Sequence, residues 1–169
     1  AFQLSLVAIQ GIDATESETP KMIGIGQAGL VAGAYHFYGV FQLGVIGAIT
    51  KKFTGLIQVA GIVADAREFI GAVLFAPYTR VDRFYGFSNI GVVNFSQEFN
   101  GFAMLAIIMN WSAVVNGVHM GIFNRAKSLS GMQVGVVNSA ANLKGIQIGV
   151  LNHFENGVIP YMVLMNAGF

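Results

Sequence analysis

The sequence contains no cysteine, few charged residues and little proline. Of its 169 residues, 10% are Asp, Glu, Lys or Arg, and three are proline. The absence of cysteine excludes disulfides, thiolate metal sites and a cysteine nucleophile. An average soluble domain is about 25% charged. So little charge cannot cover a water-facing surface, and we expect lipid or a large partner to cover much of the exterior.

Motifs that bind nucleic acid or carry out catalysis are also missing. The net charge is +1, and the longest basic run is the pair Lys51–Lys52. Nucleic-acid phosphates require clustered Lys and Arg, so we expect no nucleic-acid partner. No G-x-S-x-G motif occurs, and Gly24-Ile25-Gly26 is not followed by the Gly-Lys-Ser/Thr of a phosphate loop. We therefore expect no enzymatic activity, no cofactor and no metal.

The chain does contain an internal repeat, which is clearest over Gly131–Asn152. The pattern G-h-Q-h-G-h-h-N, in which h is apolar, occurs there twice, 14 residues apart. Its apolar residues recur at every second position, the period of a β-strand. Looser copies of the unit extend through the rest of the chain. The sequence therefore predicts one all-β domain over residues 1–169.

Two uncharged stretches, Met22–Thr50 and Gly101–Asn124, are long enough to cross a membrane as helices. Hydropathy alone would assign them as transmembrane helices. The repeat continues through both stretches, however, and glycine interrupts each of them every few residues. A helical interpretation would leave the repeat unexplained, so we expect strands here as well.

The architecture that we expect is an up-and-down β-barrel of the transmembrane type with about 10–12 strands. A strand of roughly ten residues and a short turn fill each unit, and a tilted strand of this length crosses a bilayer. Closure satisfies the backbone groups without water. Met132, Val134 and Val136 would face lipid, while Gln133 and Gly135 would face the lumen. The alternation that ends at Phe169 resembles the closing strand of bacterial outer-membrane barrels.

The alternative architecture is a β-solenoid with about 14 residues in each coil. The apolar triplet of each unit would then fill a thin core, and Gln and Asn would stack in ladders along the axis. In either fold we expect certain polar residues to face the lumen or to form ladders. These candidates are Gln27, Gln42, His119, Gln133, Gln147, Asn138 and Asn152.

Two polar segments interrupt the repeat. Gly11–Pro20 is acidic and is expected to be an exposed loop. Pro77–Arg83 is expected to be a second polar loop, and it supplies Arg80, Asp82 and Arg83 as candidate contact residues on the outside of the molecule.

The pattern is similar to that of the surface repeat-containing proteins of Gram-negative bacteria. The shared features are the opening FQLSLV at Phe2–Val7, the repeated unit and the ending over Asn156–Phe169. The similarity is strongest over Gly117–Phe169 and weak over Gly55–Gly86. It implies a secreted protein of the cell envelope and no established biochemical activity.

The function that we expect is a structural or accessory role in a larger envelope assembly, as an outer-membrane barrel in contact with lipid and protein partners. One alternative is a narrow pore for small or apolar solutes. The other is a surface β-solenoid used for interaction or adhesion. The chain begins at Ala1 without Met, directly in an apolar alternation, which fits a mature protein whose signal peptide has been removed. Together with the resemblance, which implies a Gram-negative cell envelope, this leads us to expect export to the outer membrane or cell surface.

Overall fold

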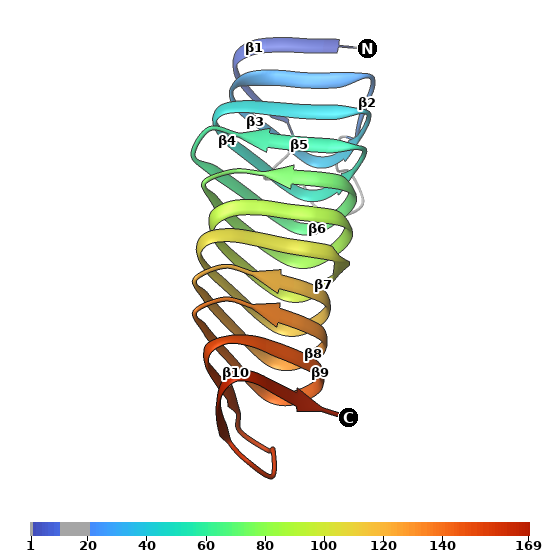
Figure 1. The fold of residues 1–169 in the computed structure, drawn as a ribbon. Helices are drawn as coiled ribbons and strands as arrows, with labels where there is room; N and C mark the ends of the chain where they lie inside the picture. The colour runs from blue at the N-terminus through green and yellow to red at the C-terminus, as the bar shows by residue number, and fades with distance from the viewer. Residues whose placement is uncertain (1, 11–20) are drawn as a thin grey trace.

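The chain forms a β-solenoid of about eight turns, with its first and last strands at opposite ends of the stack (Figure 1). The computed structural model describes residues 2–10 and 21–169, with only the backbone path for residues 2–10 and 21. The acidic segment Gly11–Pro20 lies outside the described residues. The strands are β1 (Phe2–Gln10), β2 (Lys21–Ile23), β3 (Gly26–Tyr38), β4 (Phe41–Thr54), β5 (Ile57–Ala60), β6 (Val63–Phe75), β7 (Tyr78–Met120), β8 (Phe123–Val134), β9 (Val137–Phe154) and β10 (Tyr161–Gly168). In this part of the chain, no helix could span a membrane.

Each coil pairs in parallel with the coil before it, so equivalent residues of the repeat lie directly over one another. Gln27 pairs with Gln42, and Gln133 pairs with Gln147. The 43-residue strand β7 therefore winds through successive coils. The one antiparallel pair is β10 with β9, at the C-terminal end of the described stack.

The all-β prediction is confirmed, but the barrel is wrong and the solenoid alternative is correct. An up-and-down barrel pairs neighbouring strands in antiparallel order. In this chain, parallel pairing at a spacing of one repeat brings identical amides within hydrogen-bonding distance, as in other amide ladders. The exact recurrence of Gln and Asn, and not the hydropathy, was the feature that distinguished the two folds.

Four columns of side chains fill the interior. One contains the Gln positions. A second begins with Ala32, Ala48 and Ala64 and continues as Thr79 and then asparagines, and a third holds small residues such as Ala66 and Ala140. The fourth is a run of buried rings, Phe37, Phe53, Phe69, Phe84 and Phe99, with stacked centroids 4.9–5.2 Å apart. Such narrow, regular packing suits a core only a few side chains across.

The apolar triplet of the repeat faces outwards, which corrects the core that the solenoid alternative predicted. Gln133 is fully buried, while Met132 and Val134 are half-buried and Val136 is 47% exposed. This is the in–out order that the barrel hypothesis assigned to these residues. Burial of the Gln133 amide costs little because Gln147 Nε2 donates to its Oε1 and its own Nε2 donates to the carbonyl oxygen of Ser139. The apolar side chains are consequently left on the surface.

The coils are 14 to 16 residues long, as the partners Gly131–Gly145 and Gly47–Val63 illustrate. An added residue is accommodated at a corner. Val40 and Phe41 both donate their backbone N–H to the carbonyl of Ile25, at 2.9 and 3.2 Å. The fully buried columns keep their register while the corners absorb the difference in length.

Candidate interaction surfaces

The four predicted glutamines, together with Gln58, which was not predicted, form hydrogen-bonded ladders at both ends of one interior column. Gln42 Nε2 donates to Gln27 Oε1 at 2.7 Å, and Gln58 Nε2 donates to Gln42 Oε1 at 2.8 Å. Near the other end, Gln147 Nε2 donates to Gln133 Oε1 at 2.9 Å. All five side chains are fully buried, so their amides bind one another and are not presented to a ligand.

The asparagines form a second ladder, which is continuous through five coils. Asn94, Asn110, Asn124 and Asn138 each donate through Nδ2 to the Oδ1 of the next asparagine, ending at Asn152, with distances of 2.8–3.0 Å. The Nδ2 groups donate towards the C-terminal end of the stack. The Gln donors point the opposite way, so the dipoles of the two ladders oppose each other.

The glutamine column is interrupted in the middle of the stack. After Gln58 it continues through Leu74, Asn89, Met104 and His119 before glutamine returns. Among the described residues, neither amide atom of Asn89 has a hydrogen-bond partner. Apolar neighbours one coil away on either side explain this, because neither can donate or accept.

His119 occupies a glutamine position in this interruption. Its ring is fully buried, and Nε2 shares a hydrogen bond of 3.2 Å with Ser112 Oγ. Burial disfavours the charged imidazolium and lowers the pKa of His119 to about 3. The side chain is therefore a neutral member of the core at ordinary pH, placed away from any surface that could bind a ligand.

Between Lys51 and Lys127, charged residues are confined to one side of the solenoid, here called the charged side. It consists of the segment of each coil that runs from the Ala/Asn column to the Phe column, for example Ala48–Phe53. Every charged residue from Lys51 to Lys127 lies in such a segment. They are Lys51, Lys52, Asp65, Arg67, Glu68, Arg80, Asp82, Arg83, Glu98, Arg125 and Lys127. Lys144 lies outside this side, next to Gly145.

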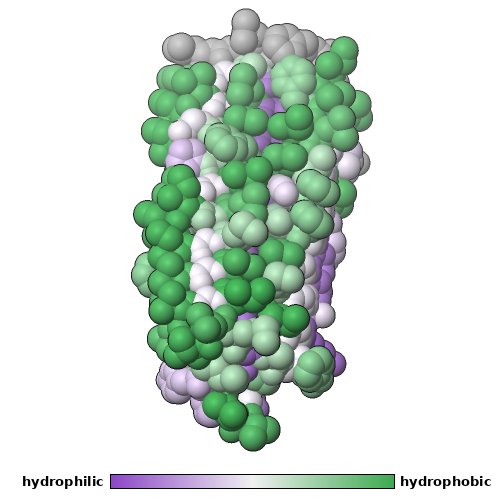
Figure 2. Space-filling model, in the orientation of Figure 1, coloured by the Kyte–Doolittle hydropathy of each residue, from purple (hydrophilic) through white to green (hydrophobic). Residues whose placement is uncertain are grey.

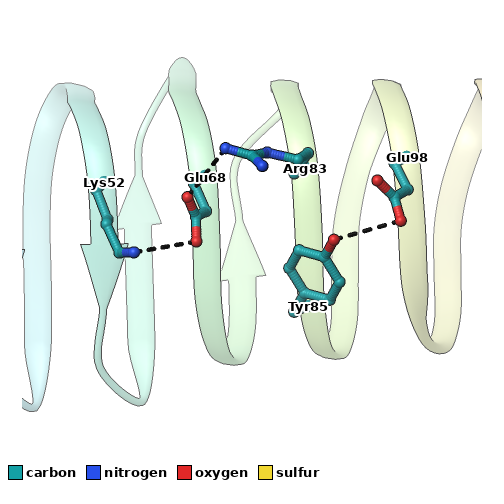
Figure 3. A network of polar contacts seen from close by, with 5 residues as sticks. All are labelled: Lys52, Glu68, Arg83, Tyr85 and Glu98. Atoms are coloured by element: carbon teal, nitrogen blue, oxygen red, sulfur yellow. Dashed lines mark hydrogen bonds and ion pairs between the residues drawn. The ribbon is translucent and has the colours of Figure 1, made fainter.

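Two sets of polar contacts join successive coils along the charged side and its edge at Tyr85 (Figure 3). Glu68 accepts from Lys52 and from Arg83, each at 3.2 Å. In the next coils Tyr85 donates to Glu98 at 3.3 Å. Desolvation and then the Glu98 carboxylate raise the pKa of Tyr85 above its usual value. Because the two ion pairs of Glu68 are partly exposed to solvent, each contributes about 0–1 kcal/mol to stability.

Arg80, Asp82 and Arg83 lie in strand β7 and not in the polar loop that the sequence predicted. Arg83 is held by Glu68. Arg80 and Asp82 instead line a depression of about 220 Å³. Of the three candidates, Arg83 therefore forms an ion pair, and Arg80 and Asp82 line a shallow hollow.

The aromatic residues Tyr78, Phe95 and Trp111 line the same hollow. Tyr78 and Phe95 have ring centroids 5.7 Å apart, and those of Phe95 and Trp111 are 6.3 Å apart. Nearby, burial raises the pKa of Asp65 above its usual range, although the positive charge of Arg80 opposes the shift. The hollow combines aromatic surface with polar groups but is small and open.

The other side of the solenoid, here called the apolar side, corresponds to the apolar exterior that we expected lipid or a large partner to cover. It is the remainder of each coil and contains no charged residue from Met22 to Leu143. Most of the face in view in Figure 2 is hydrophobic. The exposed side chains of the apolar side include Leu43, Leu56, Ile57, Phe75, Phe87, Phe102, Met120, Ile146 and Ile148. The sequence signal for this side is the apolar flanking of each buried Gln, as in Met132 and Val134 on either side of Gln133.

Within residues 22–169, no three His, Cys, Asp or Glu side chains are grouped so as to hold a metal ion. No protein-family model, curated protein or solved structure matches the chain. The apolar side and the charged side are therefore the candidate functional features.

Proposed function

We propose that this protein is a non-enzymatic cell-surface β-solenoid that acts as an interaction scaffold and places its apolar side against another macromolecular surface. The observation that carries the proposal is the segregation of charge. One side of each coil holds all the charged residues between Lys51 and Lys127, and the other exposes large apolar side chains. Contiguous exposed apolar surface of this extent marks interaction sites in soluble proteins.

The interior supports a structural role. Its polar groups are mostly amides that bind each other in ladders, such as Asn124 to Asn138 at 2.9 Å. A rigid stack with such a core holds a surface flat and fixed, which suits a scaffold. The side chains also fill the interior, so the narrow pore, which required a barrel lumen, has no counterpart in this fold.

The location proposed for this scaffold is the surface of a Gram-negative cell. Its support is the similarity of the repeat and of the ending Asn156–Phe169 to surface repeat-containing proteins. Envelope proteins are the partners that this location suggests.

The proposal is tested by placing charge on the apolar side. Ile148, 42% exposed, is changed to Asp, and Lys127 on the charged side is changed to Asp as the control. In detergent-free buffer the parent protein should self-associate or bind a hydrophobic dye or phosphatidylcholine vesicles. Ile148→Asp should weaken that behaviour severalfold, and Lys127→Asp should not. A parent protein that does none of the three would contradict the proposal.

A further inference from the structure

The apolar side carries a projecting pair of rings at the middle of the stack. Phe87 and Phe102 are 58% and 64% exposed, and they stack with centroids 5.0 Å apart and planes 6° from parallel. They occupy a corner position at which the coil has an additional residue. The rings form a rigid apolar knob that spans two adjacent coils.

A groove begins directly beside this knob. It has a volume of about 430 Å³, and Phe102 forms one end of it. Its floor is the glycine column Gly117, Gly131 and Gly145, and its wall includes Met132 and Ile146. The three glycines have φ values of +138° to +144°, and a Cβ added at any of them would clash with the carbonyl oxygen of the equivalent glycine in the preceding coil. The groove is thus built into the fold, because a side chain at these positions would be strained.

We propose that the apolar side binds a second copy of this chain, with the Phe87–Phe102 knob of each copy seated in the glycine groove of the other. The proposal rests on the proposed function and names the partner. Knob and groove lie on one line along the axis. A two-fold axis that runs parallel to the strands and crosses that line near Val118 therefore places each knob over the partner's groove. Such self-complementarity is the requirement for a closed, isologous dimer.

The area of contact is sufficient for a specific dimer. The two antiparallel stacks would overlap over about six coils, and strands are spaced about 4.8 Å apart. The overlap then covers about 30 Å by 16 Å on each copy, or roughly 1,000 Å² in total, the lower limit for a specific interface. The spacing of the two rings equals that of the coils, so both rings meet equivalent positions in the groove.

Charge favours a second copy over a membrane surface. Two copies of the apolar side can face each other with little like-charge repulsion, because this side carries no charge from Met22 to Leu143. The charged residue beside the groove is Lys144, next to Gly145, and the two-fold axis near Val118 places it away from the partner's Lys144.

Helices and other elements that lie on membranes usually add a row of basic residues next to the apolar surface. The basic residues here, such as Arg67 and Arg125, lie on the charged side instead. Asn100 and Asn116, which are joined by a 2.6 Å hydrogen bond, supply a polar rim beside the groove.

Analytical ultracentrifugation tests this arrangement with three proteins, each in detergent-free buffer. The parent protein should sediment as a dimer. The double variant Phe87→Ser, Phe102→Ser should sediment as a monomer, with its dimer dissociation constant raised at least about 100-fold. The control Phe123→Ser removes a phenylalanine that is 48% exposed beyond the adjacent corner, and it should remain a dimer. Circular dichroism confirms that each variant keeps its β-structure.

A second measurement uses the absence of cysteine from the chain. Val118→Cys places one thiol near the two-fold axis, so a short bis-maleimide should link two copies in high yield. Lys127→Cys, on the charged side, should not be linked. A monomeric parent, open-ended oligomers, or a dimer that survives loss of both rings would overturn the inference. A monomeric parent that binds phosphatidylcholine vesicles would overturn the dimer and leave the proposed function standing, whereas a monomer that binds neither vesicles nor dye would remove both.

Discussion

At the scale of single residues, Asn89 and Asn110 show how the same side chain behaves differently in two columns of one core. Both are fully buried. Asn110 exchanges hydrogen bonds with the asparagines of the coils before and after it, at 3.0 and 2.9 Å. Asn89 lies between Leu74 and Met104 in the described structure and has no partner. A buried amide without partners costs about 1–3 kcal/mol.

Asn89→Leu should therefore stabilise the protein, by about 1–2 kcal/mol, because it removes the unsatisfied amide and retains similar volume. Asn110→Leu is the matched control and should destabilise the protein by about 2–4 kcal/mol, because it leaves neighbouring amides unpaired. Unfolding in guanidinium chloride measures both. A loss of stability in Asn89→Leu comparable with that in Asn110→Leu would contradict the explanation.

His119 should make stability depend on pH. Its pKa in the folded protein is about 3, below the usual 6.5, so the unfolded chain binds more protons between these values. Its contribution is complete above pH 6.5 and is lost as the pH falls towards 3, by up to about 1.4 kcal/mol per pH unit. Denaturant unfolding at pH 7, 5 and 4 checks this. His119→Gln should make the free energy of unfolding less dependent on pH. If this variant loses stability as steeply as the parent protein when the pH falls, other titratable groups cause the loss.

At the scale of elements, the column of five buried phenylalanine rings links the strands of successive coils, as the amide ladders link the polar side chains of the interior. Phe69 stacks on both Phe53 and Phe84, with centroids 4.9 Å away on each side. Each ring thus ties its strand to the strands of two neighbouring coils.

Phe69→Ala should destabilise the protein by about 3–5 kcal/mol, since it opens a cavity and breaks two ring contacts. Phe75→Ala, in the same strand β6 but 46% exposed, is the control and should cost less than about 1 kcal/mol. The difference in thermal or denaturant midpoint is the measurement. Similar losses in the two variants would show that the column is not the main support of this strand.

Strand formation and part of the two ladders could be predicted from the sequence, because alternation and exact recurrence are local properties. Because Gln133 and Gln147 are identical residues at equivalent positions of the repeat, the sequence indicated that they contact each other. Four other ladder residues were missed because the repeat is looser around them, namely Gln58, Asn94, Asn110 and Asn124.

The direction of pairing could not be deduced from alternation, because both parallel and antiparallel strands alternate. The outward orientation of Met132 and Val134 also remained ambiguous, because hydropathy favours their burial and only the satisfied amides of the interior reverse that preference. The depression near Trp111 requires the three-dimensional proximity of two coils.

At the scale of the whole molecule, stability should be close to a sum over coils and their nearest neighbours. Deletion of Gly131–Lys144 removes one complete coil. The preceding coil, Gly117–Ser130, pairs with the deleted coil in the same register in which the deleted coil pairs with the following one, so the two remaining coils can pair directly. The shortened chain should keep its β-sheet circular dichroism and unfold cooperatively.

Deletion of Gly131–Val137 is the control for this prediction. It removes half a coil and would place glutamine and asparagine columns out of register. That variant should lose its β-sheet spectrum or aggregate. If the two deletions behave alike, the register of the columns does not govern folding.

The variation in coil length has a practical consequence. Coils of 14, 15 and 16 residues coexist in one stack, so the corners already accommodate one or two additional residues. A corner such as Gly61–Ile62 should accept a short foreign peptide, and successive corners would present such peptides at intervals of about 4.8 Å. The solenoid could thus display attached groups at a fixed spacing, which is set by the separation of adjacent strands.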